Sequence, residues 1–268
     1  MEPVEWMPRL QAELRRLGAF QLEGSRRLAG AEIQVKEDDR EGESLVTRWD
    51  LESESMLRDF VQREFPVHSF LGEEFGNEVR DPAHYWIADP IDGTTNFTLG
   101  IPLWGSSLAY WRDGRPSLGF IYFPALDRMY TAWRSGGAYL NGAAIRTSSD
   151  REYSLRNGVA LHSRTHLSHR LCLRTKVRIL GSVIANLCYV AQGMLVAAYA
   201  KGRLWDYAAG ALLVEEAGGI VETQPDLLGL DLAKYALGES PAKPITLFAS
   251  ANADLPSLSR FLLPNPPE

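Results

Sequence analysis

Two carboxylates that follow an apolar run are the residues best suited to chemistry. Residues 86–88 are apolar, Asp89 comes next, and Asp92 follows three residues later, after Pro90 and Ile91. Pro90 restricts the local backbone, so both carboxylates are able to face one pocket at the end of a strand. Two hard oxygen donors would converge there. The structural alternative is that the aspartates only cap a turn or a helix, which is their commonest role in such a setting.

A small segment rich in hydrogen-bond donors follows this pair. Gly93, Thr94 and Thr95 stand where a helix is expected to begin. Free backbone N–H groups and the helix dipole attract phosphate at such a position. The spacing therefore predicts that a metal site and a phosphate site adjoin each other.

Two further acidic motifs accompany this segment. Glu73 and Glu74 follow an apolar stretch and Gly72, and Asp206 follows Trp205 at another expected helix start. Together with the segment 89–97, which reads Asp-Pro-Ile-Asp-Gly-Thr-Thr-Asn-Phe, these motifs resemble the inositol monophosphatase family in type and in order. The resemblance spans nearly the whole chain, from Lys36 to Gly219.

The resemblance implies an α+β fold, a layered αβαβα sandwich like that of the inositol monophosphatases and fructose-1,6-bisphosphatases. It also implies a Mg²⁺-dependent phosphomonoesterase that hydrolyses inositol monophosphate or a related polyol or sugar phosphate by attack of a metal-activated water. The implied cofactor is Mg²⁺, about two or three ions per active site, or Mn²⁺ in its place, since both prefer oxygen ligands. Homodimers and inhibition by lithium are expected on the same basis.

Individual roles are carried over from the family position by position. The implied metal ligands are the side chains of Glu73, Asp89, Asp92 and Asp206 and the backbone carbonyl of Ile91. The implied catalytic residues are Asp50 and Thr94, which would hold and help deprotonate the attacking water, and Glu74, which would support them. The implied phosphate and substrate contacts are Gly93, Thr94, Gly181, Ser182 and Lys36. For Lys36 a surface lysine is the alternative, and for Ser182 an ordinary helix cap.

Departures from the family pattern leave the substrate open. Bulky residues precede Asp50, and Ala200 stands where inositol-specific relatives carry a substrate-binding glutamate. Histidinol phosphate, fructose 1,6-bisphosphate and 3′-phosphoadenosine 5′-phosphate are therefore alternative substrates. An alternative of another class is a regulatory protein that binds a phosphorylated ligand and has lost the chemistry.

Composition and charge restrict the partners. Of 268 residues, 28 are basic and 34 acidic, a formal net charge of −6, and no long basic run is present. A nucleic-acid partner is disfavoured, and a small phosphorylated molecule is expected instead. With only Cys172 and Cys188, no export signal and no apolar stretch long enough to span a bilayer, a cytoplasmic location without membrane contact is predicted.

One basic segment invites a different interpretation. His162, His166 and His169 precede Cys172, a spacing that could suggest zinc. Four basic residues lie among or just after them, namely Arg164, Arg170, Arg174 and Lys176. Their positive charge disfavours another cation, so the segment is interpreted as a basic rim for an anionic substrate or as a solvated face.

The helices and strands that must position these candidate residues are predicted from the periodicity of apolar residues. Apolar residues at three- and four-residue steps predict helices over 7–17 and 57–65, and residues 35–44 between them suit a loop or an exposed hairpin. Runs rich in aromatic and aliphatic residues predict strands at 85–88, 105–111, 118–123 and 129–133. The turn Asp113-Gly114 favours an antiparallel hairpin.

The C-terminal part alternates between strands and helices. Strands are expected at 159–162, 177–180, 219–221 and 245–249, and helices at 182–200 and 207–217. The polar segment 146–156 is the best boundary. Two subdomains are therefore expected: an N-terminal α+β unit over 1–147 with most of the metal ligands, and a C-terminal α/β unit over 148–268 with Asp206 and the substrate contacts.

Overall fold

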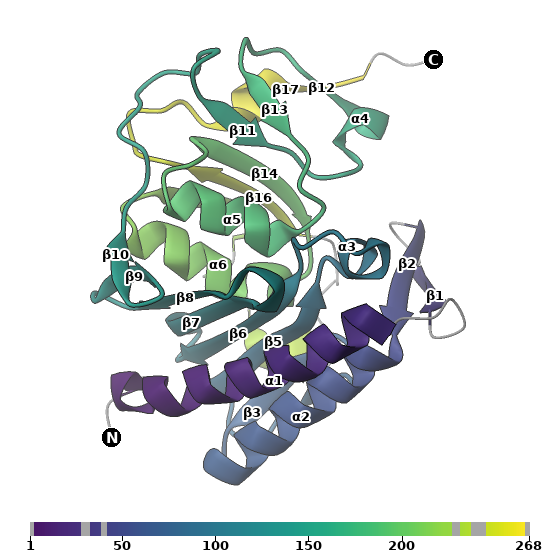
Figure 1. Ribbon diagram of the computed structural model, residues 1–268. Coiled ribbons are helices and arrows are strands. Elements are labelled where there is room, and N and C mark those ends of the chain that lie inside the picture. The colour runs from purple at the N-terminus through teal and green to yellow at the C-terminus, as the bar shows by residue number, and fades with distance from the viewer. Residues whose placement is uncertain (1–2, 28–32, 39–41, 227–230, 237–244, 266–268) are drawn as a thin grey trace.

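The chain folds into five stacked layers of alternating helices and sheets (Figure 1). The structure, a computed structural model, describes residues 3–27, 33–38, 42–226, 231–236 and 245–265. In Figure 1 the layers run from two long helices at the bottom, through a large sheet, a pair of central helices and a smaller sheet, to short elements at the top.

The first layer consists of α1 (Met7–Arg27) and α2 (Arg48–Glu64). Both predicted helices are confirmed, and both are longer than the apolar periodicity indicated. The stripe Leu10, Leu14 and Leu17 of α1 is fully buried against the large sheet. Burial of such a stripe drives an amphipathic helix onto a sheet, and each leucine contributes about 1.5–3 kcal/mol. A short 3-10 helix, Pro3–Trp6, precedes α1.

The second layer is an eight-stranded sheet in the order β10-β9-β8-β7-β6-β5-β3-β4. Its strands are β3 (Ser69–Gly72), β4 (Asn77–Glu78), β5 (His84–Asp92), β6 (Gly105–Arg112), β7 (Arg115–Phe123), β8 (Arg128–Trp133), β9 (Gly137–Leu140) and β10 (Ala143–Ile145). Every pair is antiparallel except β3 with β5. The predicted hairpin is confirmed, since Asp113 and Gly114 join β6 to β7 with positive φ angles.

Two apolar helices form the central layer, α5 (Val183–Ala191) and α6 (Leu204–Glu216). Helix α6 buries residues all around its circumference because it lies between the two sheets. Alternate residues of β5 face opposite layers. Tyr85 and Ile87 pack with α5 and α6, whereas Trp86 and Ala88 pack with α1 and α2.

The fourth layer is a five-stranded sheet in the order β13-β11-β14-β16-β15. Its strands are β11 (Gly158–Ala160), β13 (Lys176–Arg178), β14 (Ala197–Gly202), β15 (Ile220–Gln224) and β16 (Ile245–Ser250). The three strands β13, β11 and β14 run parallel, and β16 is antiparallel to both of its neighbours. The four strands predicted in this part of the chain are confirmed with small shifts of their ends.

The helix predicted over 182–200 is wrong in its second half. Helix α5 ends at Ala191, Gly193 has a φ of 76°, and residues 197–202 form the central strand β14. Alanine favours helices, so the run of alanines in β14 carries a misleading local preference. Pairing on both sides and burial between two layers outweigh that preference.

Short elements complete the molecule. The fifth layer contains α4 (Thr165–Ser168), β12 (His169–Leu171), η5 (Leu258–Phe261) and β17 (Leu262–Pro264). The segment predicted as a loop or exposed hairpin is a hairpin, β1 (Ile33–Asp38) with β2 (Gly42–Thr47). The 3-10 helix Pro124–Leu126 and the helices α3 (Thr94–Leu99) and α7 (Leu232–Ala236) lie at turns.

The two halves of the chain share their largest apolar core. Tyr85 and Ile87 of the large sheet pack in one cluster with Leu187 of α5 and Leu212 of α6. Residues 146–157, which connect the two sheets along the chain, contain no helix or strand. The division of the chain at residue 147 stays a prediction.

Within the described ranges, no helix combines the length and apolarity needed to cross a lipid bilayer.

Candidate functional site

Asp89 lies where the regular pairing of β5 with β6 is interrupted. The register shifts between Asp89 and Asp92, and this bulge contains Pro90, which has no N–H group for the ladder. A bulge redirects side chains, and Asp89 is left with 1% exposure. The interruption therefore leaves Pro90 and Ile91, between the two aspartates, outside the regular pairing with β6.

Two polar side chains hold this bulge, one from α1 and one from the neighbouring strand β6. The Nε2 atom of Gln21, in α1, donates to the Pro90 carbonyl over 2.8 Å, and Ser106 Oγ donates to the same oxygen over 2.8 Å. Gln21 also contacts Ser53 of α2. These residues were not predicted from the sequence, because nothing in the pattern of α1 distinguishes Gln21 from a solvent-facing glutamine.

A buried glutamate holds the segment that contains Glu73 and Glu74. Glu54 of α2 has 0% exposure, and its carboxylate accepts the backbone N–H groups of Glu74 over 2.6 Å and Phe75 over 3.0 Å. Arg58 pairs with Glu54 at 3.1 Å. A Cβ atom at Gly72 would overlap this carboxylate, so glycine is required there. Glu54 was not predicted from the sequence, because its position in α2 does not differ from that of an ordinary helical glutamate.

Replacing Glu54 with glutamine is expected to loosen this segment. The charge that holds two N–H groups and Arg58 is lost inside the protein, which should cost about 3 kcal/mol of unfolding free energy. The Mg²⁺ concentration for half-maximal activity should rise as well. Urea unfolding and a Mg²⁺ titration measure the two effects, with the exposed Glu52→Gln as the matched control. Equal stability and Mg²⁺ dependence in both variants would show that Glu54 does not hold the segment.

Asp206 lies in the first turn of α6. Its Oδ2 accepts the Arg203 N–H over 2.6 Å, so the carboxylate also holds the helix start. A Cβ atom at Gly202 would overlap Oδ2, and glycine thus allows the strand β14 to approach this carboxylate closely. The predicted helix start at Asp206 is confirmed.

Three of the predicted acids meet in one group. Glu73, Asp89 and Asp206 each offer a carboxylate oxygen, and these oxygens lie within 4.8 Å of one another. They follow β3, lie in β5 and begin α6, respectively. Burial, followed by the charges of Glu73, Asp92 and Asp206, raises the pKa of Asp89 well above its usual value. The Oδ1 atom of Asp89 is buried and accepts no hydrogen bond from the described residues.

This donor set fits a hard divalent cation. An unsatisfied buried carboxylate oxygen costs free energy, and neighbouring carboxylates repel one another. A cation that prefers oxygen ligands removes both costs, whereas zinc favours nitrogen and sulfur. Among the described residues, the histidines 162, 166 and 169 form no such group.

Asp92 is placed differently from the other three acids. Its carboxylate accepts Ser182 Oγ over 2.7 Å and the N–H groups of Val183 and Ile184 over 3.2 and 2.6 Å, at the start of α5. Burial raises its pKa, and these donors oppose that rise. Asp92 thus also holds α5 against β5, and its charge is close enough to raise the pKa of Asp89. The position of Asp92 at the start of α5 is compatible with both roles considered from the sequence, a helix cap and a metal ligand.

Asp50, Thr94 and Ile91 form a connected set beside the acidic group. Thr94 Oγ1 lies 3.3 Å from Asp50 Oδ1 and 3.1 Å from the Ile91 carbonyl oxygen. Thr47 donates to Asp50 Oδ2 from its backbone N–H over 2.8 Å and from its hydroxyl over 2.6 Å. Burial raises the pKa of Asp50 to about 6, a rise that these hydrogen bonds oppose and the Glu74 charge supports. A carboxylate of this pKa is able to accept a proton near neutral pH.

The predicted phosphate and substrate contacts adjoin Asp92. Gly93 is the N-cap of α3, with a φ of 84°, and a Cβ atom there would lie 3.2 Å from the Ser182 Cβ. Ser182 caps α5 through the Ala185 N–H over 3.1 Å. Gly181 has a φ of 73° and contacts Asn96, whose amide donates to the Leu180 carbonyl over 2.8 Å. Lys36 lies in β1, and its side chain is outside the described residues.

Comparison with known proteins places this geometry in a family. The family model described as "Inositol monophosphatase family" matches residues 12–247. An inositol-1-monophosphatase of Rhizobium meliloti is 37% identical over 65% of this chain and 70% of its own. The Nus factor SuhB of Escherichia coli is 34% identical over 70% of this chain and 74% of its own.

Solved structures share the fold. The extragenic suppressor protein suhB of Bartonella henselae is 26% identical, with a TM-score of 0.76 over 92% of this chain and 94% of that one. A structure described as IMPase/NADP phosphatase complexed with Mg²⁺ and phosphate is 22% identical, with a TM-score of 0.75 over 94% of this chain and 93% of that one. The predicted αβαβα sandwich of the α+β class is confirmed.

The layered fold and the comparisons together define a phosphoric monoester hydrolase. The chain belongs to the inositol monophosphatase family. The resemblance drawn from the three acidic motifs is thereby confirmed.

Proposed function

We propose that this phosphatase hydrolyses a small phosphorylated metabolite with Mg²⁺ as its cofactor. One observation carries the proposal. Glu73, Asp89 and Asp206 come from three distant parts of the chain, yet their carboxylate oxygens lie within 4.8 Å of one another around the buried Asp89. Such a concentration of negative charge would repel a phosphate, whereas with cations bound it becomes an anion receptor.

In this proposal the ligands for Mg²⁺ are Glu73, Asp89, Asp92, Asp206 and the Ile91 carbonyl. The buried Oδ1 of Asp89, to which no described residue donates a hydrogen bond, supports the assignment, since such an oxygen is suited to a cation. Asp92 would combine ligation with its hydrogen bonds to α5. Mg²⁺ or Mn²⁺ at this position, about two or three ions per site, would lower the pKa of a water and neutralise charge on the leaving oxygen.

The other residues orient the water and the phosphate. Thr94 and Asp50 would hold the attacking water, with Asp50 accepting its proton and Glu74 adding negative charge nearby. The backbone N–H groups of Gly93 and Thr94 would bind phosphate oxygens. Lys36 would add a positive charge, and Gly181 and Ser182 would contact the organic part. The new bond joins the water oxygen to phosphorus, and the ester P–O bond breaks without a covalent enzyme intermediate.

The proposed substrate class is broader than the name of the family. A polyol or sugar phosphate such as inositol monophosphate suits the proposal, and histidinol phosphate, fructose 1,6-bisphosphate and 3′-phosphoadenosine 5′-phosphate are the alternatives. Relatives with names such as inositol-1-monophosphatase support the first choice. The name Nus factor SuhB for another relative keeps a non-catalytic role as a second hypothesis.

A phosphate-release screen with and without Mg²⁺ tests the proposal. We expect turnover of at least one phosphomonoester in about 5 mM MgCl₂. Turnover should be lost in excess EDTA and should recover when MgCl₂ is restored. Turnover that survives EDTA would contradict a metal-dependent mechanism. Tight binding of a phosphorylated ligand in calorimetry, without any product at saturating Mg²⁺, would favour the regulatory hypothesis instead.

Three further properties of the proposal come from the family resemblance alone. They are inhibition by lithium, assembly as a homodimer and a cytoplasmic location. Inhibition by LiCl that equimolar NaCl does not reproduce would support the first. Light scattering after size exclusion tests the second, and cell fractionation tests the third.

A further inference from the structure

A buried polar network joins the two helices of the first layer to the bulge in β5 (Figure 1). Its members are Gln21 of α1, Ser53 of α2 and Ser106 of β6, and each has an exposure of 1% or less. The Nε2 atom of Gln21 lies 3.2 Å from Ser53 Oγ and 3.0 Å from Ser106 Oγ. Glutamine and serine are mostly exposed in folded proteins, so three of them buried together form an exception.

The network converges on one atom, the carbonyl oxygen of Pro90. This oxygen accepts Gln21 Nε2 and Ser106 Oγ, each over 2.8 Å. Ser106 Oγ also lies 3.2 Å from Gln21 Oε1, so both ends of the glutamine amide are engaged. The register shift takes residue 90 out of the regular pairing with β6. A buried carbonyl needs a donor, and the two side chains supply donors at this point.

These hydrogen bonds fix the backbone at the centre of the bulge. The ring of Pro90 already holds φ near −65°. The peptide that follows is planar, so the direction of the Pro90 carbonyl determines ψ, the one remaining soft angle of this residue. Gln21 and Ser106 hold that carbonyl from two different elements. The backbone of Pro90 is therefore fixed at both angles, and so is the orientation of Asp89 relative to Ile91.

The next carbonyl along the chain has its partner on another element. The Ile91 carbonyl accepts Thr94 Oγ1, from α3, over 3.1 Å, and the same hydroxyl lies 3.3 Å from Asp50 Oδ1. The Pro90 carbonyl is thus held by α1 and β6, whereas the Ile91 carbonyl lies among the proposed catalytic residues. A change in the direction of the first carbonyl would rotate the second one within the site.

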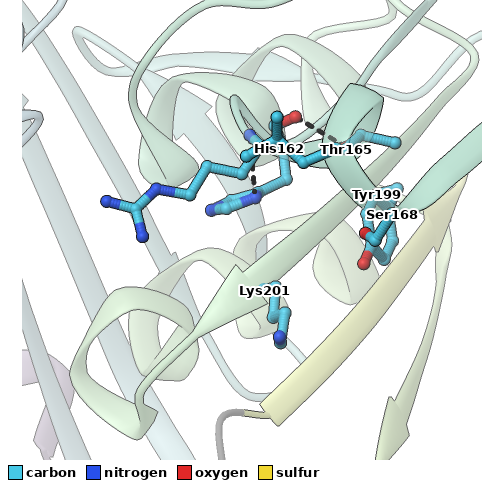
Figure 2. Close-up of a pocket in the computed structure, with 7 residues that line it drawn as sticks. His162, Thr165, Ser168, Tyr199 and Lys201 are labelled. Carbon is cyan, nitrogen blue, oxygen red and sulfur yellow. Dashed lines mark hydrogen bonds between the residues drawn. The ribbon is translucent and has the colours of Figure 1, made fainter. Parts of the chain in front are cut away.

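A polar cavity of about 210 Å³ over β14 is a separate feature (Figure 2). Its walls come from residues 162–168 and from Tyr199 and Lys201, and they include no candidate metal ligand. Within the walls, Thr165 Oγ1 donates to the His162 carbonyl over 2.6 Å. The described contacts that hold the bulge therefore come from α1 and β6 and not from this cavity.

We propose that Gln21 is a positioning residue for Mg²⁺. Together with Ser106 it fixes the backbone of Pro90 and so sets the direction of the Ile91 carbonyl relative to Asp89. The inference rests on the proposed function, in which Asp89 and Ile91 are metal ligands. Mg²⁺ requires near-ideal octahedral geometry at about 2.0–2.1 Å, whereas Ca²⁺ accepts variable geometry at about 2.3–2.6 Å. A rigid bulge therefore favours Mg²⁺ over the larger ion.

Calorimetric titration with Mg²⁺ and with Ca²⁺ tests this role without any substrate. Gln21→Met keeps the length of the side chain and removes its donors, and adding Ser106→Ala removes the second donor to the Pro90 oxygen. The Kd for Mg²⁺ should rise at least about threefold in the single variant and about 10-fold in the double variant. The Kd for Ca²⁺ should change by less than about twofold in both.

Leu14→Ala is the matched control for loss of stability. Leu14 is fully buried in the same helix, in the apolar cluster against the large sheet. Its truncation leaves a cavity and should lower the Tm in EDTA at least as far as the double variant does. The Kd for Mg²⁺ should nevertheless stay within about twofold of the wild-type value. An equal loss of Mg²⁺ affinity in Leu14→Ala would assign the effect to general loosening of α1 and would overturn the positioning role.

The outcomes separate this inference from the proposed function. A wild-type protein that binds Mg²⁺, with a double variant whose Kd rises by less than about threefold, would overturn the role of Gln21 and leave the proposed function standing. Equal weakening of Mg²⁺ and Ca²⁺ would do the same, because it would indicate collapse of the site. Gln21→Met alone carries the test if the double variant does not fold. A wild-type protein with neither Mg²⁺ binding nor Mg²⁺-dependent phosphate release would remove the proposed function and this inference with it.

Discussion

Replacing Asp89 with asparagine is expected to lower kcat/KM for phosphate release by at least about 10³-fold, equivalent to about 4 kcal/mol. Asp89 is the most buried member of the acidic group, and one of its oxygens has no donor among the described residues. Asparagine is nearly isosteric, but it removes the negative charge that would bind a cation. Steady-state phosphate release at saturating Mg²⁺ measures the loss.

The same substitution is expected not to destabilise the metal-free protein. Burial and neighbouring carboxylates raise the pKa of Asp89, so its ionised form is unfavourable in the fold. Thermal unfolding in EDTA at pH 8 should therefore give a Tm for Asp89→Asn at or above the wild-type value. The exposed Asp59→Asn serves as control and should keep full activity. A variant that unfolds, or one that retains more than about a tenth of wild-type activity, would count against Asp89 as a metal ligand.

Stabilisation of the protein by Mg²⁺ is expected to be larger at pH 8 than at pH 5. The pKa of Asp50 is raised from 3.8 to about 6 in the fold, and those of Asp89 and Asp92 are raised as well. Between the unfolded and folded pKa values, the native state binds more protons than the unfolded state, so unfolding free energy falls as pH rises. For Asp50 alone the full fall is about 3 kcal/mol.

Bound Mg²⁺ should reverse this fall, because it stabilises the ionised carboxylates. At 100 times its dissociation constant the cation adds about 2.7 kcal/mol to the unfolding free energy, and protonation at pH 5 weakens its binding. Differential scanning fluorimetry with MgCl₂ at both pH values measures the shift in Tm, and NaCl of equal ionic strength is the control. A shift that is independent of pH, or one that NaCl reproduces, would contradict a carboxylate site for the cation.

Much of the site was predictable because its residues lie in short continuous motifs. The segment 89–97 predicted a strand that ends in acids and a helix that begins at Gly93, and β5 and α3 have this arrangement. Helices α1 and α2 were predicted from apolar spacing, since burial of one helix face determines both the spacing and the packing. Their ends were less predictable, because Thr47 and Asp50 define the start of α2 through a local capping box.

Residues that support the site from other elements were not predictable in this way. Gln21 lies 69 positions from the Pro90 carbonyl that it holds, and Glu54 lies 20 positions from the N–H group of Glu74. Neither has a local pattern that differs from that of an ordinary helical residue. The strand β14 was mistaken for helix because its alanines have no strand preference of their own.

The amino-acid sequence by itself determined the chemical class of this protein and the types of its elements, because motif composition and apolar periodicity are local properties. Only the tertiary structure decided which acids meet: Glu73, Asp89 and Asp206 converge, while Asp92 lies under the start of α5. It also decided that the parallel strands β11, β13 and β14 end at one edge of the five-stranded sheet. The physical reason is that strand pairing and burial bring together segments that are far apart in the chain, and no local preference encodes those contacts.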